Sequence, residues 1–346
     1  MHNTFLTRWV IAASLALAGG GGAHAQQVVL KVHHMLPGTS NPQAHLIEPW
    51  CDKINKQSND RLKCQIFPAM QLGGTPPQLF DQVRDGVVDI VWTVPTYAAG
   101  RFSKSEVFEL PFMAHTAKSG SQALWQYVHK NALDEFKGVR PILMHVHDGS
   151  VFHFRSKPVK RLEELRGMKI RAATRINARM LAALGATPVQ MPLPQVAEAL
   201  SKGVIDGAMV PWEGVPAIKL HEIAKYHLET PPGAPRFSNT IFVMAINPAK
   251  YDSLPADLKK VIDANSGLAM SAWAGEKGWD ATVEPHRQLA KDRGNNFTVL
   301  SDEELARWVK ASENVDDNWV KEVTARGADG RRLLDEARAL IKQYDK

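Results

Sequence analysis

The stretch QLFDQVRDGVVDIVWTV (residues 78–94) decides the fold class of this chain. Gln78 to Arg84 has the apolar spacing of a helix, and Gly86 supplies the kind of stop at which helices end. Val87 to Val94 then forms a near-continuous apolar run that Asp89 interrupts. Such a run is typical of a strand buried on both faces of a parallel sheet. A helix, a glycine and a buried strand in this order predict an α/β fold.

The same alternation continues on both sides of this stretch. The expected elements are strands at 28–32, 62–67 and 141–147, and helices at 41–57 (kinked at Pro49) and 119–136. Parallel strands joined by helices require crossover connections, so this part of the chain is expected to form one α/β lobe.

A second unit of the same kind begins near Ser150. Its expected elements are strands at 168–171, 187–191 and 204–210, and helices at 177–184 and 194–202. A strand over Phe237–Ile246 should return the chain to the first unit. After Pro255 nearly everything reads as helix, beginning with a helix that extends past His286. We therefore expect a first lobe of residues 26–148 with about 236–275, and a second lobe of 149–235 with about 276–346. Ligands of open α/β sheets bind beyond the carboxyl ends of strands, so the cleft between the lobes is the expected site.

The N-terminus has the features of a secretory signal peptide. Arg8 precedes the apolar stretch Trp9–Ala18, and Ala23-His24-Ala25 places small residues where a signal peptidase cuts. A membrane anchor is the alternative, but the apolar run is too short and Gly19 to Gly22 interrupt it. We expect residues 1–25 to be removed after Ala25 and the remaining chain to be exported, most simply to a bacterial periplasm.

Composition and cysteine content exclude several classes. The 346 residues carry a net charge of +6, which becomes +5 without the leader, and acidic and basic residues are interspersed with no run of five like charges. This favours a mixed solvated surface over a nucleic-acid partner. The two cysteines are too few for a disulfide scaffold or a four-cysteine zinc site. In an oxidising compartment Cys51 and Cys64, in a helix and the strand after it, are expected to pair, with two separate buried thiols as the alternative.

The sequence contains no complete catalytic or metal-binding motif of a known kind. His221-Glu222 begins like a zinc-protease helix, but position 225 is a lysine. His145, His147 and Asp148 alternate along a strand end, where a metal is conceivable and strand-edge polar residues are favoured. Asp206-Gly207 resembles a turn more than a catalytic acid. No cofactor or metal is expected, and an exported chain without a catalytic constellation favours ligand binding. An exported hydrolase or lyase acting on an organic acid is the alternative.

Three ordered sets of motifs resemble a known family. They are Gln71–Gly74 with Gln82–Ile90, Glu106–Phe112, and Leu165–Arg171 followed by Leu184–Val189 and Glu198–Gly207. Their order and spacing resemble the DctP-type solute-binding proteins of tripartite ATP-independent periplasmic (TRAP) transporters, over essentially the whole mature chain. The resemblance implies a two-lobe periplasmic-binding-protein-like fold with a long interlobe helix and a helical C-terminus. It also implies a receptor that closes around an organic acid and delivers it to a membrane permease.

The resemblance implies a carboxylate anchor at Arg171. In the family, the arginine that ends this motif pairs with the substrate carboxylate, and a guanidinium fork matches a carboxylate with two parallel hydrogen bonds. Thr174 is expected to add a hydroxyl contact. Arg155 and Arg101 are candidates for a second charge contact, with helix capping or loop bracing as the alternative. Glu213 is a weaker candidate for binding a cation, since some family members bind one with the substrate.

The rest of the pocket is expected to be apolar. Positions that are polar in the sialic-acid-binding branch fall at or near Val94, Val151 and Val210 in this chain. The residues Trp92, Tyr97, Leu193 and Trp212 lie close to the same pocket segments, with core packing as the alternative for the tryptophans. One anchor and aromatic walls favour a monocarboxylate with an aromatic or branched apolar body. A receptor for a C4-dicarboxylate or another oxo-acid remains an alternative, and the protein is expected to act as a monomer.

Overall fold

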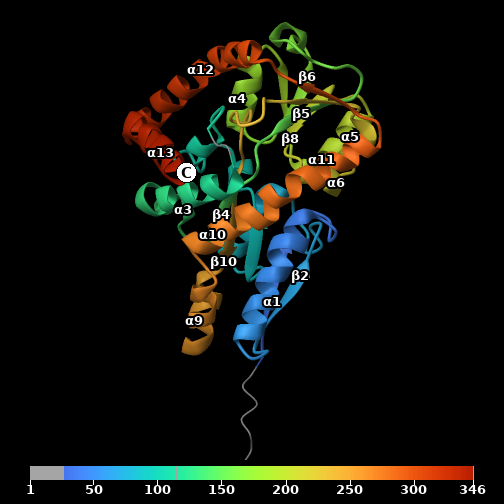
Figure 1. Ribbon diagram of the computed structural model, residues 1–346. Coiled ribbons are helices and arrows are strands. Elements are labelled where there is room, and N and C mark those ends of the chain that lie inside the picture. The colour runs from blue at the N-terminus through green and yellow to red at the C-terminus, as the bar shows by residue number, and fades with distance from the viewer. Residues whose placement is uncertain (1–26, 114–115, 346) are drawn as a thin grey trace, which may run out of the picture.

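Two β-sheets form the frameworks of two lobes in the computed structural model, which describes residues 27–113 and 116–345 (Figure 1). The first sheet has the strand order β2-β1-β3-β10-β4. Its strands are β1 (Val28–His34), β2 (Leu62–Phe67), β3 (Ile90–Thr93), β4 (Arg140–Val146) and β10 (Ile241–Ile246). β1 is parallel to β2 and β3, whereas β10 runs antiparallel to β3 and β4. The expected α/β fold is confirmed, with one returning strand that makes the sheet mixed.

The second sheet has the order β11-β9-β5-β8-β6-β7. Its strands are β5 (Val151–Phe154), β6 (Lys169–Ala172), β7 (Thr187–Gln190), β8 (Gly207–Val210), β9 (Tyr226–Glu229) and β11 (Asn296–Val299). β6 is parallel to β7 and β8, and β5 is antiparallel to β8 and β9. The carboxyl ends of β6 and β8 therefore lie at the same edge of this sheet as the start of β5.

Helices cover both sheets. The α-helices are α1 (Glu48–Gln57), α2 (Leu79–Arg84), α3 (Ala117–Asn131), α4 (Arg175–Ala183), α5 (Val196–Ser201), α6 (Gly214–Ala217), α7 (Leu220–Ile223), α8 (Pro248–Asp252), α9 (Ala256–Ala264), α10 (Leu268–Trp273), α11 (Val283–Asp292), α12 (Asp302–Ala325) and α13 (Gly330–Tyr344). A π-helical turn, Gln43–Ile47, precedes α1 where the sequence predicted one helix kinked at Pro49. No helix of the described ranges combines the length and apolar character needed to cross a bilayer.

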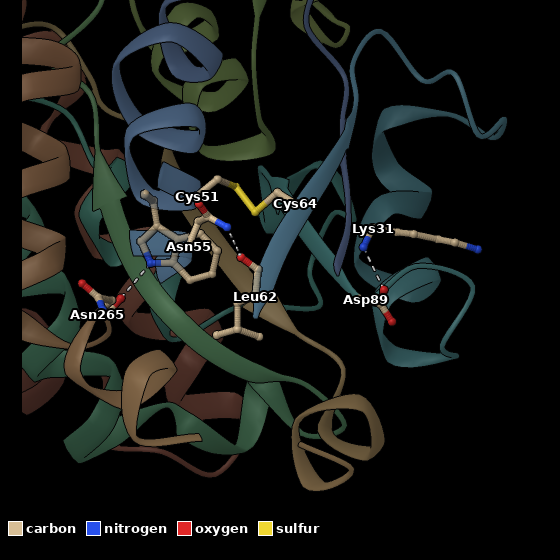
Figure 2. Close-up of a disulfide and its surroundings, with 8 residues drawn as sticks. Lys31, Cys51, Asn55, Leu62, Cys64, Asp89 and Asn265 are labelled. Atoms are coloured by element: carbon tan, nitrogen blue, oxygen red, sulfur yellow. Dashed lines mark hydrogen bonds between the residues drawn. A yellow bond between two sulfur atoms is a disulfide. The ribbon is translucent and has the colours of Figure 1, made fainter. Parts of the chain in front are cut away.

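The same helix–glycine–strand unit starts a buried strand in each lobe, but the strands are shorter than predicted. Val87 and Val204 follow Gly86 and Gly203 in a turn and are 59% and 51% exposed. Strands β3 and β8 begin three residues after these valines. Just before β3, Asp89 accepts a hydrogen bond from the Lys31 N–H (2.8 Å; Figure 2). Asp206 accepts from the Lys169 N–H in the same way, also at 2.8 Å. These aspartates therefore brace neighbouring strands, which is a structural role and not a catalytic one.

A chain of short helices crosses from one lobe to the other. α10 continues through the π-helix Ala274–Trp279 and a 3-10 turn (Asp280–Thr282) into α11, the oblique orange path of Figure 1. The sequence predicted one helix from Pro255 past His286. The structure breaks it after α9, because Gly267 has a φ of +94°, which a helix cannot accommodate. At Gly275 the crossing segment lies so close to α3 that a Cβ would come within 2.4 Å of the Ala117 carbonyl oxygen.

The C-terminal helices divide between the lobes, which corrects the predicted boundary. α12 packs against α4 in the second lobe, but α13 returns to α3 in the first. The Tyr344 hydroxyl bonds to Gln126 (2.6 Å) and Lys130 pairs with Glu336 (2.6 Å). The assignment of 276–346 to the second lobe is therefore wrong for Gly330–Tyr344. The predicted return to the first lobe at about residue 236 comes later in the structure, because Phe237 packs on Phe152 and Trp308 in the core of the second lobe.

A disulfide joins Cys51 of α1 to Cys64 of β2, with their Cα atoms 5.8 Å apart (Figure 2). Beside it, the Asn55 side chain donates to the Leu62 carbonyl oxygen at 2.9 Å and closes the same helix–strand connection. Cross-linking a loop of this length stabilises a fold by about 3 kcal/mol, because it restricts the unfolded chain. The link thus fixes the edge strand of the first sheet to the helix that covers it.

Candidate ligand-binding site

A cavity of about 420 Å³ lies between the two lobes. Its walls follow the carboxyl ends of strands β1, β3, β4, β6 and β8 and the beginning of β10, which is where α/β sheets bind ligands. The lining residues are Met35, Leu36, Trp92, Val94, Tyr97, His147, Ser150, Arg171, Ala173, Leu193, Pro211, Glu213, Thr240 and Phe242.

A wider depression of about 1370 Å³ lies on the outside of the first lobe and is open to solvent. It is lined by Trp125 of α3, Tyr251 of α8 and Arg140, which starts β4 and so lies at the opposite end of that strand from the interlobe cavity. Arg140 is already paired with Asp263 at 2.9 Å. The interlobe cavity is therefore the better candidate for an anionic ligand.

Arg171 supplies the cavity's positive charge. It lies on β6, is 2% exposed, and donates from Nε to the Met191 carbonyl oxygen (2.9 Å) and from Nη1 to the Met209 carbonyl oxygen (2.8 Å). These bonds hold the guanidinium rigid and leave Nη2 without a main-chain acceptor. Burial lowers the pKa of Arg171, but a guanidinium keeps its proton in proteins. No Asp or Glu of the described residues forms an ion pair with it, so a buried cation lacks a protein counter-charge.

Tyr97 brings a hydroxyl from the first lobe to the guanidinium. Its oxygen accepts the main-chain N–H of Leu193 at 3.3 Å, so its own proton is available to another acceptor. Burial raises the pKa of Tyr97, and the neighbouring charge of Arg171 opposes that rise. The phenol therefore stays a neutral donor beside the cation.

His147, at the end of β4, offers a further donor to the same region. The Gly149 N–H donates to its Nδ1 at 2.9 Å, which places the ring proton on Nε2. Burial lowers the pKa of His147 to about 3, and the neighbouring His145 and Arg171 act in the same direction. The ring is thus a neutral N–H donor over the ordinary pH range.

Aromatic rings form one wall of the cavity. Trp92 stacks on Phe242, with ring centroids 5.0 Å apart and planes 13° from parallel. The indole N–H of Trp92 donates to His145 Nε2 at 2.8 Å, so the ring orientation is fixed from behind. Because His145 uses both ring nitrogens within the protein, it has none left for a metal. Val94 and Leu193 complete the apolar lining.

Glu213 is the one carboxyl among the described lining residues. It is 2% exposed, and its Oε2 has no hydrogen-bond partner. Burial and the neighbouring Asp148 raise its pKa to about 8, so the neutral acid is favoured at neutral pH. Among the described residues no three His, Cys, Asp or Glu side chains gather as a metal site.

Several residues expected at the site do not line the cavity. Trp212 turns into the second lobe, where its indole N–H donates to Glu229 (2.9 Å) and its ring contacts His153. The side chain of Val210 is buried in β8, and Thr174 is buried at the N-cap of α4.

Both candidate second arginines serve local structure. Arg155 donates from Nη1 to the carbonyl oxygens of Leu200 and Ser201 at the end of α5. It follows β5, which runs antiparallel to β8, and so lies at the edge away from the cavity. Arg101 pairs with Asp81 at 2.7 Å.

The structure therefore brings together Arg171, Tyr97, Trp92, Val94 and Leu193 from the predicted set. It adds polar groups that sequence reasoning did not assign to ligand binding, namely His147, Ser150 and Thr240. From the sequence, His147 is a strand-edge polar residue or a metal ligand. Its position at the carboxyl end of the predicted strand 141–147 is the signal that places it at the site.

Comparison with known proteins gives a consistent result. A model of the family DctP, the bacterial extracellular solute-binding proteins of family 7, matches residues 33–322. A TRAP solute-binding protein from Rhodoferax ferrireducens, solved with copurified benzoate, is 44% identical with a TM-score of 0.91, and the match covers 92% of this chain and 99% of that chain.

Two further solved structures match over nearly the same span. A TRAP solute-binding protein from a marine metagenome, specific for aromatic acid ligands and crystallised with 3-hydroxybenzoate, is 47% identical with a TM-score of 0.91, and the match covers 93% of this chain and 100% of that chain. A protein of the same kind from Bordetella bronchiseptica, with bound (R)- and (S)-mandelate, is 30% identical with a TM-score of 0.84, and the match covers 91% and 99%.

Proposed function

Since the chain belongs to the DctP family of bacterial extracellular solute-binding proteins, we propose that its interlobe cavity binds an aromatic monocarboxylate. It is a TRAP solute-binding protein and not an enzyme, and its ligand is a small organic acid. The proposal concerns the class of acid and the residues that hold it.

The observation that carries the proposal is the buried Arg171 without a protein counter-charge in a largely apolar cavity. An uncompensated buried charge is costly, and a ligand carboxylate removes that cost. With Nε and Nη1 held by carbonyl oxygens, Nη2 remains for the ligand, and Tyr97 and His147 each offer a further neutral donor. Together they make one anion-binding corner.

The apolar lining supports a ring as the body of the ligand. Trp92 and Phe242 present aromatic surface, and Val94 and Leu193 add aliphatic surface. Aromatic pairs gain about 0.5–1.5 kcal/mol beyond the area that they bury. A C4-dicarboxylate would instead need a second cation, and no other Arg or Lys stands among the described lining residues. The solved relatives with benzoate, 3-hydroxybenzoate and mandelate agree with this choice.

We infer further that the chain works outside the cytoplasm and delivers its ligand to the membrane permease of a TRAP transporter. The apolar stretch and Ala23-His24-Ala25 support removal of residues 1–25, which lie outside the described residues. Mass spectrometry of the exported protein, expected to begin at Gln26, checks the cleavage.

A thermal-shift screen tests the ligand class. The protein, freed of copurified ligand by dialysis in denaturant and refolding, is heated with benzoate, 3-hydroxybenzoate, mandelate and succinate. An aromatic acid at a hundredfold excess over its Kd should stabilise the fold by about 2.7 kcal/mol. Benzyl alcohol, which lacks the carboxylate, is the matched control and should give no shift. Stabilisation by succinate alone, or by no acid, would refute the proposal.

A further inference from the structure

Glu213 is a buried acid with an unused hydrogen-bonding atom in the wall of the ligand cavity. Glu213 follows β8, and Arg171 is the last residue but one of the neighbouring parallel strand β6, so both side chains come from the same edge of the second sheet. Glu213 is 2% exposed and forms no ion pair with a described residue, and its Oε2 is buried without a partner. Buried polar atoms in native proteins are nearly always satisfied. The chain offers the indole N–H of Trp279 near this carboxyl, and a ligand group in the cavity is the other available partner.

The groups around Glu213 favour its neutral form. Its charged neighbour is Asp148, a second buried carboxyl, and not a cation. Asp148 is itself influenced by Asp280 and Arg236, and burial raises its pKa to about 7. The indole of Trp279 is the one nearby donor that favours the Glu213 carboxylate, and burial outweighs its effect. A carboxylic acid kept protonated by such surroundings can both donate and accept a hydrogen bond.

A cation is the competing partner for this oxygen. It would need several oxygen ligands, but Asp148 is the one acidic neighbour that acts on Glu213, and no three-ligand group exists among the described residues. Arg171 already provides the positive charge that an anionic ligand requires. A neutral hydroxyl group fits the site better, since it can accept from the acid and donate to Oε2.

We propose that Glu213 binds a hydroxyl group on the ring of the ligand, so that the cavity selects hydroxylated aromatic monocarboxylates over unsubstituted ones. This inference rests on the proposed function, since it takes the ligand carboxylate to lie on Arg171. The carboxylate and the hydroxyl would then be held by residues at the carboxyl ends of two adjacent strands of one lobe. Glu213 thereby determines specificity, whereas Arg171 determines affinity for the carboxylate.

Isothermal titration calorimetry of benzoate and of 2-, 3- and 4-hydroxybenzoate tests this selection. Each acid is titrated into the wild type, Glu213→Leu and Glu213→Gln, with Glu222→Leu as the matched control because Glu222 lies on α7 outside the cavity. In the wild type, at least one hydroxybenzoate should bind about tenfold more tightly than benzoate, the effect of one hydrogen bond to a buried partner. Glu213→Leu should abolish that advantage, whereas Glu213→Gln and Glu222→Leu should retain most of it.

The possible outcomes separate this inference from the proposed function. If benzoate and all three isomers bind the wild type equally, or if the hydroxyl advantage survives in Glu213→Leu, the role of Glu213 is refuted and the aromatic-acid function stands. If benzoate binding requires sodium and both Glu213 variants lose it, Glu213 holds a cation, and the inference is again refuted. If no aromatic acid binds the wild type, both proposals fail.

Discussion

Arg175 of α4 in the second lobe donates to the carboxylate of Glu106 in the first lobe from two guanidinium nitrogens, with the Nε bond at 2.8 Å. Glu106 is 1% exposed and lies in the 3-10 helix Ser105–Glu109. Arg175 also donates to Glu322 of α12 at 2.7 Å, and Arg179 binds the other oxygen of Glu322. A buried ionic link thus joins the lobes outside the ligand cavity.

Removing the charge of Glu106 should destabilise the protein. Glu106→Gln weakens the contact with Arg175, but Glu322 still faces that guanidinium and burial raises the pKa of Glu106 to about 7, so the loss should be about 1.5–3 kcal/mol. Urea unfolding measures the change. Arg331→Met is the control, because its ion pair with Asp317 is more than half exposed and should contribute less than about 1 kcal/mol. If the two substitutions lowered the free energy of unfolding equally, the buried Arg175–Glu106 pair would contribute no more stability than an exposed pair.

The Cys51–Cys64 link should contribute to stability and not to ligand affinity. Replacing both cysteines by serine is expected to lower the free energy of unfolding by about 3 kcal/mol. Neither residue lines the cavity, so the Kd for an aromatic acid should stay within about twofold of the wild-type value. Dithiothreitol treatment of the wild type should reproduce the loss of stability. A variant with normal stability, or with clearly weakened binding, would show that the link acts otherwise.

The interior of each lobe could be predicted from sequence because local patterns determine it. The segments around Asp89 and Asp206 each have the pattern of a helix, a glycine stop and a buried strand. The structure gives the two segments equivalent positions in the two sheets. Arg171, Trp92 and Tyr97 could be placed near the site for a related reason, since each lies at or just after a strand end that faces the cleft.

Side-chain direction and long-range docking could not be predicted in the same way. Trp212 is near the site in sequence, but its indole turns toward Glu229 because a buried N–H requires an acceptor. Arg155 follows a strand whose antiparallel orientation appears only when β5 pairs with β8. The return of α13 to α3 depends on which lobe offers an apolar face, and an amphipathic pattern does not identify its partner.

The raised pKa of Glu213 predicts a pH-dependent contribution to the stability of the unliganded protein. The folded-state value is about 8 and the ordinary value is 4.5, so this contribution is complete below about pH 4.5 and is lost as the pH rises through about 8. Glu213→Gln removes the titrating carboxyl at position 213 and leaves the carboxyl of Asp148. The variant should therefore gain on the order of 3 kcal/mol relative to the wild type between about pH 5 and pH 8.

Urea unfolding of the wild type and Glu213→Gln at these two pH values measures that gain. Glu222→Gln, whose carboxylate is exposed on α7 and pairs with Arg293, is the control and should show no such change. A stability difference between wild type and Glu213→Gln that is the same at both pH values would mean that Glu213 is ionised in the folded protein.

Arg171→Lys tests whether the shape of the guanidinium matters beyond its charge. Arg171 uses Nε and Nη1 for two carbonyl oxygens on different segments, which leaves Nη2 for the ligand. A lysine ammonium is one point charge that cannot reach the same three acceptors. Losing one or two charge-assisted hydrogen bonds of about 1.5–3 kcal/mol each should weaken benzoate binding at least tenfold by calorimetry.

Arg155→Lys is the control, because the Arg155 guanidinium caps α5, and it should leave the Kd unchanged. If Arg171→Lys bound benzoate as tightly as the wild type, the carboxylate would have to lie elsewhere in the cavity, on the neutral donors His147 and Tyr97.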